Sequence, residues 1–272
     1  MDTAGAGPFA RYLRLLGITP RPPRLDALNE LVAAHITRVP FENLSKLHFR
    51  ADAAMRLPAV DRFLDGLEFQ RFGGTCYANN YHLTRLLDHL GYEVRLCGAD
   101  MRNPDVHLVG IVRLDGREYL VDGGYGAPFL TAMPLDLPHE LVIEWAGDRY
   151  VLRPRDPDGR SRLDLWRDGI LRHGYRVNPA PRRIEEFARV IDDSFAPGAT
   201  FMNALVIVRT FTDSSLVLNN RTLIVSAGAS RRVEEVASAE ALPAIIEARY
   251  GIPAAIAREV LVGLDLTMDA WG

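Results

Sequence analysis

The sequence predicts an α+β protein built in three parts. Apolar residues recur at helical spacing through the first 90 residues. From about residue 93 to residue 200, short apolar runs alternate with Gly, Asp and Pro. Because helices precede strands rather than alternating with them, a doubly wound parallel sheet is excluded. We therefore expect a helical bundle over 1–90, an antiparallel meander or barrel over 91–200 and a small α/β unit over 201–272.

The helices of the first part follow from apolar stripes that end near Gly or Pro. The stripes predict helices over about 9–16, 25–36, 60–67 and 76–90, with Gly17 after the first, Pro40 after the second, Pro58 near the start of the third and Gly91 after the fourth.

The second and third parts are defined by short runs between turns. The expected strands of the second part are Val94–Leu96, Leu108–Leu114, Tyr119–Val121, Leu141–Trp145 and Arg149–Leu152, with Pro154–Arg162 as a loop. The third part is expected to contain strands at Ala204–Val208 and Thr222–Val225 and helices at Val233–Arg249 and Ala254–Leu261.

Composition and charge exclude several classes of function. With 48% hydrophobic and 25% charged residues over 272 positions, the chain is an ordinary globular protein with a sizeable core. A net charge of −3 gives no electrostatic basis for binding nucleic acid or an anionic membrane. Lys46 is the single lysine, so no phosphate-binding loop of the Gly-Lys-Ser/Thr type is present. We expect Lys46 to lie in a loop without desolvation.

Neither a metal site nor a secretory signal is expected. Two cysteines are too few for a disulfide framework or a Cys-rich zinc site. His82 and His89 are seven residues apart beside charged neighbours, which predicts a solvated helix face. No apolar run is long enough to span a membrane, and residues 1–5 lack signal-peptide features, so we expect a cytoplasmic protein.

Cys76 has the setting of a nucleophile. Gly73 and Gly74 allow a sharp backbone turn, and Thr75 is the expected N-cap of the following helix. Cys76 then lies in the first turn, where free N–H groups and the helix dipole stabilise a thiolate. A buried structural cysteine is the alternative. Cys97, inside a strand-like run, is expected to be a core residue.

A histidine and a carboxylate that could complete such a site come from one hairpin. The Asp-Gly pair at 115–116 is a strong signal for a two-residue turn. With this pair at its centre, Val109 faces Asp122 and His107 faces Gly124. His107 and Asp122 then share one side of the ribbon as diagonal neighbours, within hydrogen-bonding reach. A shift of one residue would place them on opposite sides.

These residues resemble the arylamine N-acetyltransferase family, whose Cys-His-Asp core is similar to that of transglutaminases and papain-like proteases. The motifs that match are Val-Pro-Phe-Glu-Asn-Leu at 39–44, Phe-Gly-Gly-Thr-Cys-Tyr at 72–77, Asn80, Tyr-Leu-Val-Asp-Gly-Gly-Tyr-Gly at 119–126 and Met-Asn-Ala-Leu-Val at 202–206. They span nearly the whole chain in the family's order. The resemblance implies a helical bundle, a β-barrel and an α/β lid, with the triad Cys76, His107 and Asp122 between the first two.

The chain departs from the family pattern at three positions. Phe72 stands where the family usually has Arg, and Arg71 lies one position early. Ala78 stands where Glu is usual, and Gly123 replaces Val. The displaced arginine is expected to leave Glu42 without its partner, and the acyl donor and acceptor are the properties that these changes put in question.

The resemblance also implies substrate contacts near the triad. Phe41 and Tyr125 are placed in active-site loops, where they could hold an aromatic acceptor. Gly124 and Gly126 lie in the run at 123–126, whose backbone N–H groups could bind a pyrophosphate or an acyl oxygen. The alternatives are core packing for Phe41 and a tight turn for the glycines. The run lacks the spacing of a dinucleotide-binding fingerprint and is followed by prolines.

The function expected is N-acyl transfer by ping-pong chemistry. Cys76 attacks the thioester of acetyl-CoA or another acyl donor, His107 moves the proton, and Asp122 orients the imidazole. A small-molecule amine then takes the acyl group, and no permanently bound cofactor is needed. Three alternatives remain open: an amide synthase that takes its chain from an acyl carrier protein, a thioester hydrolase, and a catalytically silent binding module.

Overall fold

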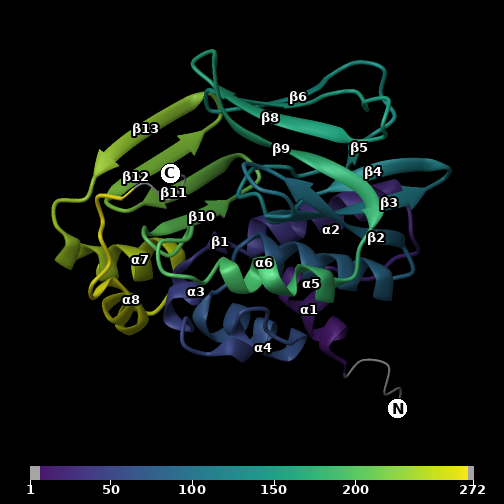
Figure 1. Cartoon of the computed structure of the whole chain (residues 1–272). Helices are drawn as coiled ribbons and strands as arrows, with labels where there is room; N and C mark the ends of the chain where they lie inside the picture. The colour runs from purple at the N-terminus through teal and green to yellow at the C-terminus, as the bar shows by residue number, and fades with distance from the viewer. Residues whose placement is uncertain (1–6, 269–272) are drawn as a thin grey trace.

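The computed structural model describes residues 7–268; residues 1–5, on which the absence of a signal peptide was argued, lie outside this range. Helices come first along the chain, then an eight-stranded sheet, then a second sheet with two helices (Figure 1). This order confirms the α+β class. Within residues 7–268, every helix is too short or too polar to traverse a lipid bilayer.

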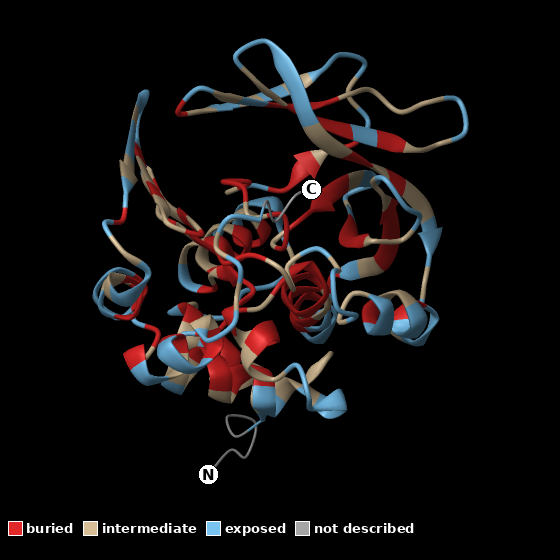
Figure 2. Ribbon diagram, turned by 60° about the vertical axis from the view of Figure 1, so that its left-hand side comes forward, coloured by how far each residue is buried: buried red, intermediate tan, exposed pale blue. Residues whose placement is uncertain are grey.

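The N-terminal helices surround one central helix. Their bounds are α1 (Pro8–Leu16), α2 (Leu25–Arg38), α3 (Leu44–His48), α4 (Val60–Asp65) and α5 (Cys76–His89), with a 3-10 turn at Ala53–Met55 and a π-helical turn at Gly66–Gln70. α5 is buried along most of its length and contacts β2 and β3, so it lies between the other helices and the first sheet (Figure 2). Burial on both sides makes α5 a rigid support for residues at its N-terminus.

The eight-stranded antiparallel sheet forms a nearly closed barrel. Its strands are β2 (Glu93–Asp100), β3 (His107–Leu114), β4 (Arg117–Val121), β5 (Met133–Pro134), β6 (Leu141–Trp145), β7 (Asp148–Leu152), β8 (Ser161–Arg167) and β9 (Ile170–Pro181), in the order β5-β4-β3-β2-β9-β8-β7-β6. The β3–β4 hairpin pairs Leu114 with Arg117 and Gly110 with Val121. This confirms the register predicted from the Asp-Gly turn.

The second sheet joins distant parts of the chain. Its strands are β1 (Phe41–Glu42), β10 (Val206–Thr210), β11 (Ser214–Asn219), β12 (Thr222–Ala227) and β13 (Ser230–Glu235), paired in that order. Residues of α7 (Leu242–Tyr250) and α8 (Ala254–Leu261) share an apolar cluster with this sheet. Along the chain, β9 is followed by a 3-10 turn (Ile184–Phe187) and α6 (Ala188–Asp193), which lead to β10. Another 3-10 turn (Ala239–Ala241) precedes α7.

Several expected elements are wrong in detail. Val233 begins no helix but pairs with Ile224 in the β12–β13 hairpin, and the helix starts only at Leu242. The helical spacing was misleading because Ser230–Glu235 is an edge strand, in which four of the six residues are charged and four are exposed. Neither β1 nor α6 was expected, and β8 begins inside the predicted loop at Ser161. β1 has only two residues, and it exists because β10 pairs with it.

His82 is buried, whereas the sequence predicted a solvated position. Its side chain stacks on Phe63, with ring centroids 4.3 Å apart, and its Nε2 lies 3.0 Å from the carbonyl oxygen of Pro58. Burial lowers the pKa of His82 to about 4. The prediction failed because the segment around Pro58 and Phe63 covers this face of α5. His89, on the same helix, is exposed as expected.

We expect His82 to make the fold sensitive to acid. Below pH ~6.5 the unfolded chain binds a proton at this histidine, while the native chain does so only near pH 4. Stability therefore falls as the pH drops through this window, by about 2 kcal/mol for this group between pH 7 and 5. Urea unfolding at both pH values should show a smaller loss for His82→Gln than for the wild type. His89→Gln is the matched control, and an equal pH effect in both variants would contradict the assignment.

Candidate active site

Cys76 is the first residue of α5, as the sequence predicted. Thr75 is the N-cap in extended conformation, although its side chain makes no capping hydrogen bond. Gly73 lies so close to Pro40 that an added Cβ would be 1.9 Å from the Pro40 carbonyl oxygen, which only glycine permits. Gly74 has a φ of +87°. The two glycines thus bring the chain sharply into the start of α5.

His107 and Asp122 form a buried hydrogen-bonded pair. His107 begins β3 and Asp122 follows β4, and the His107 Nε2 lies 2.9 Å from the Asp122 Oδ2. Both side chains are at most 3% exposed. The structure therefore brings together the two residues that the hairpin register placed as diagonal neighbours. With Nε2 facing Asp122, Nδ1 is the nitrogen left for a hydrogen bond with Cys76.

Each member of the pair stabilises the charged form of the other. Burial alone would lower the pKa of His107, but the charge and hydrogen bond of Asp122, with the contacts of Cys76, raise it to about 10. Burial alone would raise the pKa of Asp122, but the charge and hydrogen bond of His107 and the hydrogen bond from Asn80 hold it below its usual value. At neutral pH the pair is therefore an imidazolium and a carboxylate beside the Cys76 thiol.

Asn80 is a positioning residue that the sequence analysis did not include in the site. Its Nδ2 donates to Asp122 Oδ1 at 2.8 Å and to the carbonyl oxygen of Leu108 at 2.6 Å. Its Oδ1 accepts from the backbone N–H of Gly123 at 2.7 Å. Because Asn80 lies four residues after Cys76, the two share a face of α5. That spacing was the signal that could have identified it.

The glycines at 123–126 hold the site together. The N–H of Gly123 is bound by Asn80, and the N–H of Gly124 donates to Asp122 Oδ1 at 3.0 Å. The expectation that these groups are offered to a ligand is therefore wrong for these two, because the buried acid and amide require them. A Cβ on Gly124 would lie 2.7 Å from the Cα of Cys76. Gly126 has a φ of +75° and faces the ring of Phe41.

Phe41 and Tyr125 are both buried near the site. Phe41 packs against Phe201, with ring centroids 5.5 Å apart, in a cluster with residues of β10. Tyr125 lies 5.8 Å from His107 between ring centroids, and its hydroxyl is 2.6 Å from His173 Nδ1. Tyr125 thus contacts the candidate general base, while Phe41 packs within the second sheet.

Three further ionisable groups are a carboxylate, a thiol and an ammonium group. Asp105, a second carboxylate near His107 in sequence, instead forms an ion pair with Arg182 at 3.1 Å. Cys97 is fully buried on β2, and burial raises its pKa to about 11, as suits an inert core thiol. The prediction that Lys46 lies in a loop without desolvation is wrong. Lys46 lies on α3 and is buried, with 7% exposure, because the segment after α6 covers it. Among the residues described, no group of three His, Cys, Asp or Glu side chains could hold a metal ion.

Comparison with known proteins shows the family of the chain. A family model described as N-acetyltransferase matches residues 24–259. The arylamine N-acetyltransferase of Mycolicibacterium smegmatis is 31% identical over 259 residues, covering 89% of this chain and 90% of that protein.

The chain belongs to the arylamine N-acetyltransferase family. It is therefore an acyltransferase. The crystal structure of the Nocardia farcinica arylamine N-acetyltransferase superimposes with a TM-score of 0.78 at 25% identity, covering 98% of this chain and 97% of that one. The Mycobacterium marinum enzyme, solved in complex with CoA, gives a TM-score of 0.77 at 24% identity, covering 93% of this chain and 96% of that one.

The departure from the family motif at Phe72 has a local explanation. Glu42 does not lose its hydrogen bonds when the arginine is absent. Its carboxylate accepts from the backbone N–H and hydroxyl of Ser45, at 2.7 and 2.6 Å, and from the N–H groups of Gly73 and Gly74, at 3.2 and 2.8 Å. Phe72 instead joins the apolar cluster beneath the second sheet. Within residues 7–268 of this arylamine N-acetyltransferase, backbone N–H groups and the Ser45 hydroxyl therefore satisfy the Glu42 carboxylate without a side-chain cation.

Gly124→Ala is expected to damage the site more than the fold. The added methyl group would push the loop away from Cys76 and Asn80, and small displacements of reacting groups cost about 100-fold in rate. We expect kcat/KM for acyl transfer to fall by about that factor while the protein stays folded, with a loss of about 1–3 kcal/mol in the free energy of unfolding from overpacking. Gly7→Ala, with no atom within 4 Å of its Cβ, is the control. Activity close to wild type in Gly124→Ala would show that the loop does not fix the geometry of Cys76.

Proposed function

We propose that the protein transfers an acyl group from a CoA thioester to an arylamine or related amine through an acyl-Cys76 intermediate. The observation that carries the proposal is the buried His107–Asp122 pair beside the thiol at the start of α5. A thiolate beside an imidazolium, oriented by a carboxylate, is the arrangement that nucleophilic acyl transfer requires.

In the first half-reaction the Cys76 sulfur forms a bond to the carbonyl carbon of the thioester. The bond between that carbon and the CoA sulfur breaks, and the leaving thiolate takes the proton of the His107 imidazolium. In the second half-reaction the amine nitrogen attacks the acyl-Cys76 carbonyl. Its proton passes to His107 as the Cys76 thiolate leaves, which restores the starting ion pair. Asp122 stays ionised throughout and keeps Nε2 of His107 protonated.

The donor and acceptor classes rest on the relatives. The Mycolicibacterium smegmatis relative is an arylamine N-acetyltransferase, and the Mycobacterium marinum relative was solved with CoA. These names support acetyl-CoA or a similar acyl thioester as donor and a small amine as acceptor. Neither the site nor these relatives support an acyl carrier protein as partner. The cytoplasmic location stays a prediction from the sequence.

The acyl-enzyme is the intermediate to detect. Intact-mass analysis after mixing with acetyl-CoA should show one acetyl group on the wild type and none on Cys76→Ser, since a serine hydroxyl stays protonated beside the same histidine. Cys97→Ser should be acylated like the wild type, because Cys97 lies in the core of the sheet. Acetylation that persists in Cys76→Ser would remove Cys76 from the mechanism. The isolated acyl-enzyme is then incubated with an amine or in buffer alone. Loss of the acyl group only with the amine indicates a transferase, and loss in buffer alone indicates a hydrolase.

Asp122→Asn is expected to lower turnover by orders of magnitude. Replacing the triad aspartate of a serine protease with asparagine lowers its turnover ~10⁴-fold. It should also lower the pKa of His107, because the charge of Asp122 is what raises it. NMR titration of His107 and steady-state kinetics measure the two effects. Asp105→Asn is the matched control, since its carboxylate binds Arg182. Equal activity in both variants would show that Asp122 does not orient His107.

A further inference from the structure

His35 is a buried histidine that the proposed mechanism does not use. It lies on α2 with 0% exposure, and its Nδ1 is 2.8 Å from the hydroxyl oxygen of Tyr12 on α1, which is also fully buried. Burial lowers the pKa of His35 to about 3, so the imidazole is uncharged at neutral pH. The hydrogen bond to Tyr12 therefore fixes the orientation of a neutral ring inside the protein.

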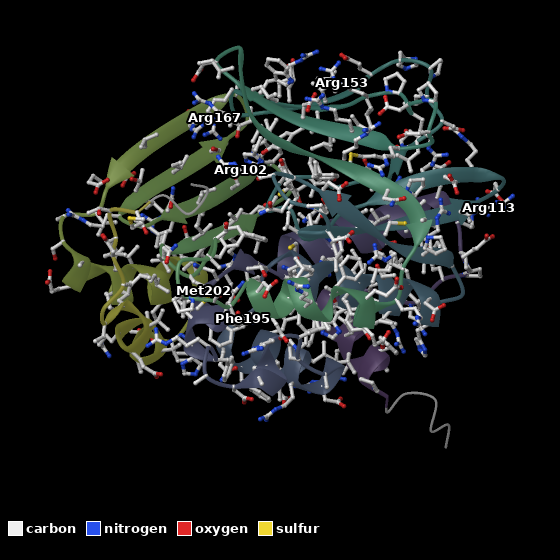
Figure 3. All side chains as sticks on the ribbon, viewed as in Figure 1. Arg102, Arg113, Arg153, Arg167, Phe195 and Met202 are labelled. Carbon is white, nitrogen blue, oxygen red and sulfur yellow. The ribbon has the colours of Figure 1, made fainter. Side chains whose placement is uncertain are left out.

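The other ring nitrogen of His35 makes no hydrogen bond. Within residues 7–268, its Nε2 is buried and has no partner. An apolar side chain would avoid the free-energy cost of this unpaired nitrogen, so stability alone does not explain a histidine at this position. Figure 3 shows side chains throughout the space between the N-terminal helices and the first sheet, and the role of the ring depends on which of these neighbours it touches.

The Nε2 side of the ring lies against Gly123, the residue that follows Asp122. A Cβ added to Gly123 would be 2.6 Å from Cδ2 and 2.9 Å from Nε2 of His35. Gly123 does not have the positive φ that favours glycine, so the close approach of the ring is the reason for a glycine here. The same Cβ would also be 3.0 Å from a methyl carbon of Leu83 on α5.

Gly123 connects this contact to the catalytic carboxylate. The N–H of Gly123 donates to Asn80 Oδ1 at 2.7 Å, and Nδ2 of Asn80 donates to Asp122 Oδ1 at 2.8 Å. The residue after Asp122 is therefore held by Asn80 at its N–H group and by His35 on the side to which a Cβ would point. A change at either contact shifts the backbone that carries the carboxylate.

We propose that His35 is a positioning residue of the acyl-transfer reaction, whose ring fixes Gly123 and thereby the carboxylate of Asp122. This rests on the proposed function. Displacing the carboxylate slows the reaction, because small movements of catalytic groups are costly in rate. It also lowers the pKa of His107, which the charge of Asp122 raises. A histidine needed only for stability would change neither the rate nor that pKa in the folded enzyme.

Two amide substitutions separate the contacts of the two ring nitrogens. The amide of asparagine reaches the place of Nδ1, so His35→Asn keeps a partner for Tyr12 and loses the contact with Gly123. The longer glutamine reaches the place of Nε2, so His35→Gln keeps atoms against Gly123. We expect kcat/KM for acetyl transfer to fall about tenfold in His35→Asn, less than the ~100-fold cost of a 1 Å misplacement, and to stay within about threefold of the wild type in His35→Gln. NMR titration should show a lowered pKa of His107 in His35→Asn only.

Gly123→Ala tests the same contact from the other partner. Its methyl group overlaps the ring of His35, so we expect a loss of at least about tenfold in kcat/KM and a lowered pKa of His107. Removing the ring makes room for this methyl group, so His35→Ala/Gly123→Ala should be more active than Gly123→Ala alone. His82→Ala is the control. His82 is also buried with an unpaired ring nitrogen but packs on Phe63, so its loss should leave the pKa of His107 unchanged.

Four results would overturn the proposal: wild-type kinetics in His35→Asn, a larger loss in His35→Gln than in His35→Asn, independent losses that multiply in the double variant, or an equal effect of His82→Ala on His107. If the His35 variants do not fold, Gly123→Ala decides, and an unchanged pKa of His107 in it would overturn the proposal. Any of these results with acetylated wild-type Cys76 rejects only this inference, whereas a wild type that is never acetylated at Cys76 rejects the proposed function.

Discussion

The buried carboxylate of Asp122 is the group on which the geometry of the site depends. It accepts from His107 on β3, from Asn80 on α5 and from the backbone of Gly124. A carboxylate without solvent needs such donors, because burial of an uncompensated charge costs several kcal/mol. Each donor belongs to a different segment, so satisfying Asp122 fixes the helix that carries Cys76 against the hairpin that carries His107.

A second buried carboxylate fixes the opposite side of Cys76. Glu42 follows Phe41 in β1, and its oxygens accept from backbone N–H groups just before the start of α5. The neighbouring Asn43 accepts from the N–H of Val206 and donates to the carbonyl oxygens of Phe201 and Ala204. The second sheet is thereby tied to the segment that leads into Cys76. Because both tethers use backbone groups, they tolerate Phe72 in place of a cation.

The sequence predicted best what depends on neighbours along the chain. The turn at 115–116 set the hairpin register, and glycines marked the start of α5. Prediction from the sequence failed for residues that are buried by segments distant along the chain. His82 is covered by the region of Pro58, and Lys46 by the residues after α6, and no local pattern contains that information. The two-residue strand β1 likewise exists only because β10 pairs with it.

The pKa values of the two buried cations His107 and Lys46 shift in opposite directions, although burial by itself lowers both. The raised pKa of His107 means that its charge stabilises the fold fully below pH ~6.5 and that this contribution is lost as the pH rises through about 10. The lowered pKa of Lys46 means that its charge is a cost below about pH 8. His107 has Asp122 as its anion, which outweighs the effect of burial on its pKa. Within residues 7–268, the polar contacts of Lys46 are a hydroxyl and an aromatic ring, so burial decides its pKa.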